Sequence, residues 1–251
     1  MKILLLNPNT SADITDLMLR TGEAVASPGT TLVPATAPRG VPYISNQAEA
    51  QIGGAVALEM LAECHDRVDA AIIAAFGDPG LFGARELFDI PVIGLAEAAM
   101  LTACMLGRRF GIVTFTRAMA PWYEECVRAH GLTGRSSGVR MLDGDFGAIS
   151  SVQDDKEQLF VELAHRAVYE NGSDVLILAG APLSGLAAKV ADRIPVPVVD
   201  QIAAAVKQAE VLVTLRTRKA TAGAFKRPPA KSSTGLAAAL ADRLAWQSSS
   251  S

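Results

Sequence analysis

Residues 69–81 read DAAIIAAFGDPGL and residues 174–186 read DVLILAGAPLSGL, and the two stretches resemble each other. Each is an apolar run that opens into a turn of small residues and ends in Gly-Leu. The similarity resumes downstream, where IPVIGLAEAA at residues 90–99 parallels VPVVDQIAAA at residues 196–205. A repeat with so long a period indicates an internal duplication and not a solenoid. Because duplicated strand-turn units of α/β proteins commonly face each other across a cleft, we expect the two turns to share one site.

The rest of the chain alternates short apolar runs with helical patterns. Strands are predicted at residues 3–6, 31–34, 69–74, 92–94, 110–115, 175–178 and 198–199. Helices are predicted at residues 47–65, 83–87, 96–106, 121–130, 155–170 and 201–215, and Thr10 or Ser11 can cap a further helix after the first strand. A continuous apolar run is typical of a parallel strand covered on both faces. The alternation therefore predicts an α/β fold with parallel sheets.

The composition indicates what kind of molecule the protein binds and where it works. The 251 residues carry 23 Lys and Arg against 26 Asp and Glu, so the net charge of −3 supplies no basic field for nucleic acid or an anionic membrane. A small-molecule substrate is the better expectation. Cys64, Cys104 and Cys126 show neither CxxC nor Cys/His spacing, so we expect no metal site and no disulfide framework. No apolar stretch has the length of a signal or membrane span, which favours a cytoplasmic protein.

The segment from Arg216 differs in kind from the rest. It is basic and rich in Pro, Ser and Thr up to residue 234, and residues 235–246 could form one more helix. We expect an extension that lies on the surface or is partly disordered.

Four motifs together resemble the aspartate/glutamate/hydantoin racemase superfamily, and within it the hydantoin and allantoin racemases. They are LNPNTS at residues 6–11, AFGDPG at 75–80, FGIVT at 110–114 and LAGAPLSGL at 178–186, in a chain similar over residues 1–212. The resemblance implies two pseudo-symmetric Rossmann-like lobes with a cofactor-free active site in the cleft between them. The first lobe would hold residues 1–105 and 206–251, and the second residues 106–205. Many such enzymes assemble, so the chain could form a homo-oligomer.

The resemblance also implies proton removal and return at a carbon next to a carbonyl. Racemisation needs a base on one face of that carbon and an acid on the other, and the family places a cysteine at the end of each duplicated strand. Here the first of these positions is Ala75, and the second is Gly180 or, with a shift of one residue, Ala181. Neither a methyl group nor a hydrogen can carry a proton in this way.

Asp78 is the one titratable residue inside either turn and is our candidate for a replacement catalytic base. The alternative is that Asp78 caps the helix after Pro79, since Asp-Pro-Gly is a common helix start. Glu97 and Asp200 could line the cleft or act as acids at helix N-termini. The three histidines fall in or at the ends of helices, where we expect solvated or packed roles. Candidate substrate-binding residues lie in the turns at the ends of strands, where backbone and side-chain donors gather: Asn7, Asn9, Thr10, Phe76, Gly77, Thr116, Ala181 and Pro182.

Three functions stay open at this point. The first is a racemase or isomerase of a hydantoin, an allantoin or an amino-acid derivative, with water or Asp78 in place of the thiols. The second is a decarboxylase-type lyase or a hydrolase, which needs only to stabilise an enolate. The third is a ligand-binding pseudoenzyme that keeps the cleft without the chemistry.

Overall fold

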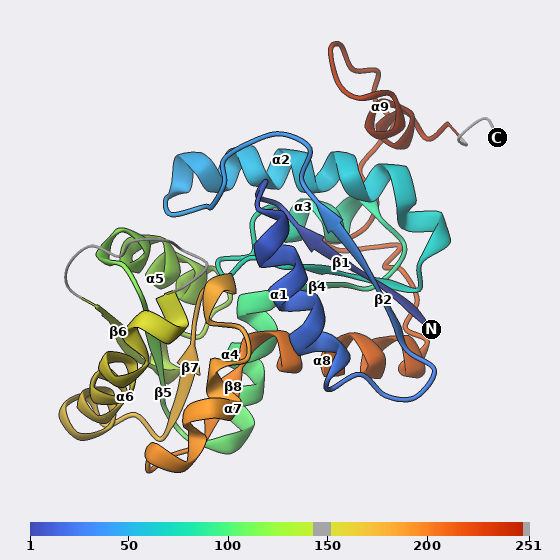
Figure 1. Cartoon of the computed structure of the whole chain (residues 1–251). Helices are drawn as coiled ribbons and strands as arrows, with labels where there is room; N and C mark the ends of the chain where they lie inside the picture. Colours follow the sequence, from blue (N-terminus) through green and yellow to red (C-terminus); the bar gives the residue numbers. More distant parts are fainter. Residues whose placement is uncertain (143–151, 248–251) are drawn as a thin grey trace.

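The computed structural model describes residues 1–142 and 152–247, and it contains two parallel four-stranded sheets (Figure 1). The first sheet has the order β2-β1-β3-β4 and the second has the order β6-β5-β7-β8. The strands of the first sheet are β1 (Lys2–Asn7), β2 (Thr31–Thr36), β3 (Ala70–Ile73) and β4 (Val92–Gly94). Those of the second are β5 (Phe110–Thr114), β6 (Ser136–Met141), β7 (Val175–Leu178) and β8 (Val198–Asp200). The prediction of an α/β fold with two parallel lobes is confirmed.

Helices connect these strands in the same sequence in both lobes. The first lobe uses α1 (Ala12–Glu23), α2 (Gln47–Cys64) and α3 (Leu81–Leu87), and α4 (Leu95–Leu106) leads to the second lobe. The second lobe uses α5 (Ala120–Ala129), α6 (Val152–Asn171) and α7 (Leu186–Val190), followed by α8 (Gln201–Leu215). The last helix is α9 (Ala238–Ala245). Because all strand pairs of both sheets are parallel, the carboxyl ends of all strands in one lobe point to the same edge.

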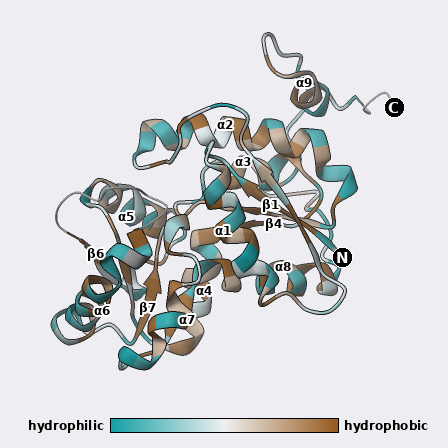
Figure 2. Cartoon of the chain, in the orientation of Figure 1, coloured by the Kyte–Doolittle hydropathy of each residue, from teal (hydrophilic) through white to brown (hydrophobic). Residues whose placement is uncertain are grey.

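The first strand shows why its sequence is apolar without a break. Ile3 and Leu5 face a core formed with α1 and α8, whereas Leu4 and Leu6 face a second core formed with α2 and α3. All four side chains are at most 2% exposed. Figure 2 shows this distribution, with hydrophobic colour along the strands and hydrophilic colour on the outer helix faces.

The helix α8 ties the C-terminal part of the chain to the first lobe. It packs against α1, α4 and strands β3 and β4, and it also contacts β8. Since α4 likewise touches strands of both sheets, the two lobes share one continuous core. The division of the chain at residues 105 and 205 stays a prediction.

Most predicted elements appear within a few residues of their expected bounds, with three differences. The short helix α7 was not predicted. Strand β6 was not predicted, because its sequence SSGVRM is polar and half-exposed at the edge of the sheet. Ser11 stands at the N-cap of α1, but its side chain makes no capping hydrogen bond. Within the described residues, no helix combines the length and the apolar character that crossing a membrane would require.

Glu210 of α8 anchors the loop between α1 and β2. Its carboxylate accepts hydrogen bonds from the Ser27 backbone N–H at 2.7 Å, the Thr30 hydroxyl at 2.8 Å and the Lys207 ammonium at 2.9 Å. Burial raises the pKa of Glu210, but these hydrogen bonds outweigh burial and lower the pKa to about 2. An ionised Glu210 therefore stabilises the folded state at neutral pH.

Replacing Glu210 with glutamine is expected to lower the free energy of unfolding by about 2 kcal/mol at pH 7. The folded pKa is depressed, so this contribution is present above pH 4.5 and is lost as the pH falls from 4.5 toward about 2. Urea unfolding of wild type and Glu210→Gln across this range should give two curves that converge at low pH. The exposed Glu23→Gln variant is the control and should change stability by less than about 0.5 kcal/mol. Parallel curves for wild type and Glu210→Gln would contradict the assignment.

Candidate active site

The two duplicated turns meet at one small cavity between the lobes. Ala75 follows β3 and Gly180 follows β7, and both residues line this cavity of about 20 Å³. The other residues in its wall are Asn9, Tyr43, Ile44, Phe76, Phe115, Met119, Trp122, Tyr123, Ala181 and Pro182. A volume of this size holds about one water molecule. The expectation that the turns converge is therefore met, but they enclose a space too small for a metabolite.

Aromatic side chains occupy the space between the turns. The rings of Phe76 and Tyr123 lie 4.7 Å apart, and the ring of Trp122 is 5.5 Å from Tyr123. The Tyr123 hydroxyl donates to the Met119 sulfur at 3.2 Å, and burial raises the pKa of Tyr123 far above its usual value. A Cβ added to Gly180 would lie 2.7 Å from the Phe115 ring. The protein is thus packed around a glycine at this turn.

No Asp, Glu, His or Cys is among the described residues that line this cavity. Acid–base catalysis there would have to use tyrosine hydroxyls or water, since the other side chains carry no exchangeable proton of suitable pKa. The geometry agrees with the observation that Ala75 and Gly180 offer no proton carrier.

The Asn-Pro-Asn loop after β1 is held by its own side chains. The Asn7 amide donates to the Asn9 carbonyl oxygen at 3.0 Å and to the Thr15 hydroxyl at 2.9 Å, so Asn7 is fully used inside the loop. The Asn9 side chain accepts from the Ser11 N–H at 3.0 Å and reaches the cavity wall. The Thr10 backbone N–H donates to Val41. Of the three predicted binding residues in this loop, the structure places Asn9 at the cavity.

Of the remaining predicted binding residues, four line either the small cavity or a larger pocket beside it, and one lines neither. Phe76, Ala181 and Pro182 line the small cavity, whereas Gly77 lines a neighbouring pocket of about 300 Å³. Thr116 lies at the start of a short 3₁₀ turn after β5 and lines neither hollow. Trp122 lines both and so forms the partition between them.

Asp78 has left-handed backbone geometry, with φ of 52°, and its side chain is turned toward α4. One carboxylate oxygen accepts from the Ala96 N–H at 2.8 Å, and the other accepts from the Glu97 N–H at 2.9 Å. The expected cap on the helix after Pro79 is wrong, because Gly80 takes the N-cap position of α3. Asp78 instead stabilises the N-terminus of α4, whose free N–H groups and dipole favour an anion.

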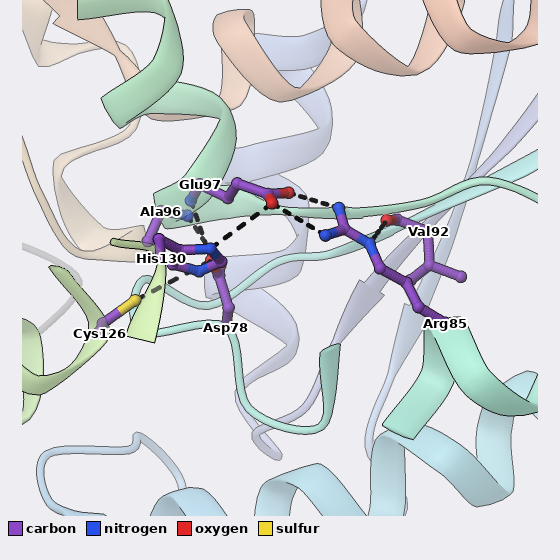
Figure 3. Close-up of polar contacts among 7 residues, drawn as sticks. All are labelled: Asp78, Arg85, Val92, Ala96, Glu97, Cys126 and His130. Carbon is purple, nitrogen blue, oxygen red and sulfur yellow. Dashed lines mark hydrogen bonds and ion pairs between the residues drawn. The ribbon is translucent and has the colours of Figure 1, made fainter. Parts of the chain in front are cut away.

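His130, at the end of α5, lies between two carboxylates (Figure 3). Its Nε2 is 3.0 Å from Asp78 Oδ2, and its Nδ1 is 3.5 Å from Glu97 Oε1. Burial lowers the pKa of His130, but the hydrogen bonds to both carboxylates outweigh burial and raise the pKa to about 9. His130 is therefore a buried imidazolium at neutral pH, with 5% of its side chain exposed.

Arg85 completes this network from α3. Its guanidinium donates to both Glu97 oxygens and to the Val92 carbonyl. Burial raises the pKa of Glu97, but its hydrogen bonds to His130 and Arg85 outweigh burial and lower the pKa to about 2. Two cations thus balance two carboxylates, as a buried charge cluster requires.

Cys126, one turn before His130 on α5, lies beside the same carboxylate. Its sulfur is 4.0 Å from Asp78 Oδ2, and burial raises the pKa of its thiol well above the usual value. Asp78, Cys126 and His130 together line the pocket of about 300 Å³, whose walls also include Gln47, Gln51, Phe82, Trp122 and Glu125. The sequence reasoning missed this grouping. The available signal was the i, i+4 spacing of Cys126 and His130 on one helix face.

The structure confirms one of the two roles predicted for Asp200, that of an acid at a helix N-terminus. Its carboxylate accepts from the Ile202 and Ala203 N–H groups at the N-terminus of α8, and also from the Gly185 N–H at 2.6 Å. It holds the second duplicated turn to α8, much as Asp78 holds the first turn to α4.

Comparison with known proteins places the chain among racemases. Residues 3–209 match the family model described as Asp/Glu/Hydantoin racemase. A hydantoin racemase of Paenarthrobacter aurescens is 31% identical over 92% of this chain and 99% of that protein. The structure of an allantoin racemase from Klebsiella pneumoniae superimposes with a TM-score of 0.90 at 33% identity, over 96% of this chain and 98% of that one. Unliganded arylmalonate decarboxylase shares the fold, with a TM-score of 0.57 at 19% identity over 84% of this chain and 92% of that one. The chain belongs to the Asp/Glu/hydantoin racemase family.

Proposed function

We propose that this protein is a racemase-type isomerase that acts at the carbon next to a carbonyl in a hydantoin, an allantoin or an amino-acid derivative. The observation that carries the proposal is the meeting of the two duplicated turns at one site in a member of a racemase family. We further propose that the reaction needs no cofactor and that the enzyme works in the cytoplasm, as a monomer or a homo-oligomer.

The turns can supply what an enolate needs. Proton loss next to a carbonyl places negative charge on the oxygen, which backbone N–H groups at turns stabilise well. Among the described residues, no backbone carbonyl outside the helices and strands accepts from the N–H groups of Phe76 and Gly77. Gly77, with φ of 108°, lets its backbone approach the Trp122 ring closely, since a Cβ added there would lie 2.3 Å from that ring.

A hydantoin, an allantoin or an amino-acid derivative has room in the pocket of about 300 Å³, a volume at the lower end of the range for small-molecule sites. Gly77 and Asp78 both line that pocket, so we keep Asp78 as the candidate proton carrier. Trp122 lines both hollows, and we propose that its movement connects the larger pocket with Ala75 and Gly180.

A second function, ligand binding without proton transfer, is favoured by one specific observation. The cavity between Ala75 and Gly180 is lined by no described Asp, Glu, His or Cys, so no carboxylate, imidazole or thiol faces either side of it. A decarboxylase-type lyase is the third alternative. Its support is the likeness of this chain to arylmalonate decarboxylase, which is a likeness of fold alone.

Hydrogen exchange in D₂O separates these functions. We expect metal-free wild type to exchange the proton at the carbon next to the carbonyl in at least one member of a panel of 5-substituted hydantoins, allantoin and free amino acids. NMR follows exchange, and chiral chromatography follows racemisation. The Asp78→Asn variant should lose exchange yet still show a thermal shift with the same ligand, whereas the exposed-carboxylate control Asp89→Asn should keep both.

The remaining outcomes decide among the alternatives. A thermal shift with no exchange would replace the isomerase by a binding protein. Exchange without racemisation would indicate proton transfer on one face only. Neither exchange nor a thermal shift with any member of the panel would overturn the proposed function. Circular dichroism of Asp78→Asn at the assay temperature shows whether the variant is folded.

A further inference from the structure

Asp78, Cys126 and His130 bring three different metal-binding groups to one point. Asp78 comes from the turn after β3, while Cys126 and His130 come from one face of α5. Asp78 Oδ2 is 3.0 Å from His130 Nε2 and 4.0 Å from Cys126 Sγ, and the three ligand atoms all lie within 4.8 Å of one another. Carboxylate, imidazole and thiolate are the side-chain groups that bind zinc.

The spacing fits a tetrahedral ion after a small adjustment. Zinc bonds of about 2.0 Å to oxygen or nitrogen and about 2.3 Å to sulfur place neighbouring ligand atoms roughly 3.3–3.5 Å apart. The Asp78–His130 pair has to open by about 0.3 Å and the Asp78–Cys126 pair has to close by about 0.5 Å to reach these values. The third pair, Cys126 and His130, lies within 4.8 Å and has to close by up to about 1.3 Å. Rotation of the two side chains about their χ angles can supply these movements.

The surroundings hold the three groups in place. His130 directs Nε2 at Asp78 and Nδ1 at Glu97, which is the arrangement in which a second carboxylate orients a metal-bound histidine. Arg85 in turn fixes Glu97, with 2.8 Å between its Nη1 and Glu97 Oε1 (Figure 3). The N–H groups of Ala96 and Glu97 fix the Asp78 carboxylate, and each oxygen still has a free lone pair when the imidazolium proton leaves.

The site is reachable and has an open position. All three residues line the pocket of about 300 Å³, which gives a metal a route of entry and leaves space for a fourth ligand such as water. Three protein ligands with one open position is the pattern of zinc sites that bind exogenous molecules.

We propose that Asp78, Cys126 and His130 bind a zinc ion through one carboxylate oxygen, one thiolate and one imidazole nitrogen. Binding displaces the thiol proton of Cys126 and the proton shared by His130 and Asp78, both of which leave to solvent. The site does not depend on the proposed reaction. An Asp78 that ligates zinc cannot carry a proton, however, so exchange assays are made on protein treated with EDTA.

The test is titration of the EDTA-treated full chain with Co²⁺ in the absence of substrate. We expect one equivalent to bind, with visible bands of a tetrahedral ion and a thiolate-to-cobalt charge-transfer band, and we expect Zn²⁺ to abolish both. Cys126→Ser should remove the charge-transfer band, and the matched Cys104→Ser should keep it. Glu97→Gln should weaken binding by about 10–100-fold, whereas Glu170→Gln, which changes an exposed carboxylate, should not.

X-ray absorption on the zinc-loaded wild type supplies a measurement that needs no variant. One sulfur at about 2.3 Å and three nitrogen or oxygen ligands at about 2.0–2.1 Å are expected. A shell without sulfur, a charge-transfer band that persists in folded Cys126→Ser, or no binding of one equivalent would overturn the site. Because no substrate is present, failure here says nothing against the isomerase, and failure of the exchange assay says nothing against the metal site.

Discussion

Replacing Asp78 with alanine is expected to lower the free energy of unfolding by about 3–5 kcal/mol, because the change leaves a buried cation without its partner. His130 would keep only the longer contact to Glu97, at 3.5 Å, inside a site where 5% of the imidazole is exposed. The N–H groups of Ala96 and Glu97 would also lose their acceptor at the N-terminus of α4. Against an ordinary stability of about 5–15 kcal/mol, this loss is from about a fifth to nearly all of the total.

Urea unfolding followed by circular dichroism measures this loss. Asp89→Ala is the matched control, since the Asp89 carboxylate is 56% exposed and pairs with Arg243 at the surface, where an ion pair contributes about 1 kcal/mol or less. The double variant Asp78→Ala/His130→Leu should recover part of the loss, because it removes the unpaired cation together with its partner. Equal effects of Asp78→Ala and Asp89→Ala would contradict the role assigned to Asp78.

The fold could be predicted from the sequence because its strands are buried on both faces. Residues 3–6 are all apolar, so neither face of the strand is suited to contact with water. The pattern alone therefore predicts a strand in a parallel sheet that is covered on both faces. Strand β6 escaped prediction for the converse reason. It pairs only with β5 at an edge, and its Ser, Gly and Arg residues satisfy the ladder without an apolar face.

The candidate site could be predicted only in part. Both turns were recognised, because small residues after a buried strand are a local signal. The partners of Asp78 were not, since Cys126 lies 48 residues away and His130 lies 52 residues away on a helix of the other lobe. The i, i+4 spacing places Cys126 and His130 on one helix face, but their meeting with Asp78 depends on how the two lobes approach each other, which no local pattern encodes. The Asp-Pro-Gly sequence likewise predicted that Asp78 caps the next helix in the chain, α3, whereas its carboxylate accepts from the N-terminus of α4.

Introducing a cysteine at Gly180 is expected to lower the free energy of unfolding by about 3–5 kcal/mol, whereas Ala75→Cys should cost about 1 kcal/mol or less. Gly180 has φ of 110° and ψ of 133°, a conformation that residues with a side chain rarely adopt. The new Cβ would also lie 2.7 Å from the ring of Phe115, a residue that is 1% exposed and cannot easily move. Ala75 already carries a Cβ, and its added sulfur points to a cavity of about 20 Å³.

A second glycine separates the two causes of that loss. Gly29→Cys also places a side chain at positive φ, 86°, but its Cβ meets nothing within 4 Å, so this control should cost only about 1 kcal/mol. A larger loss for Gly180→Cys in urea unfolding then measures the clash with Phe115. Since the space that a second thiol needs is filled by that ring, Ala75→Cys/Gly180→Cys should gain no exchange activity over wild type. A double variant that is as stable as wild type and exchanges faster would show that the site lacks only its two sulfur atoms.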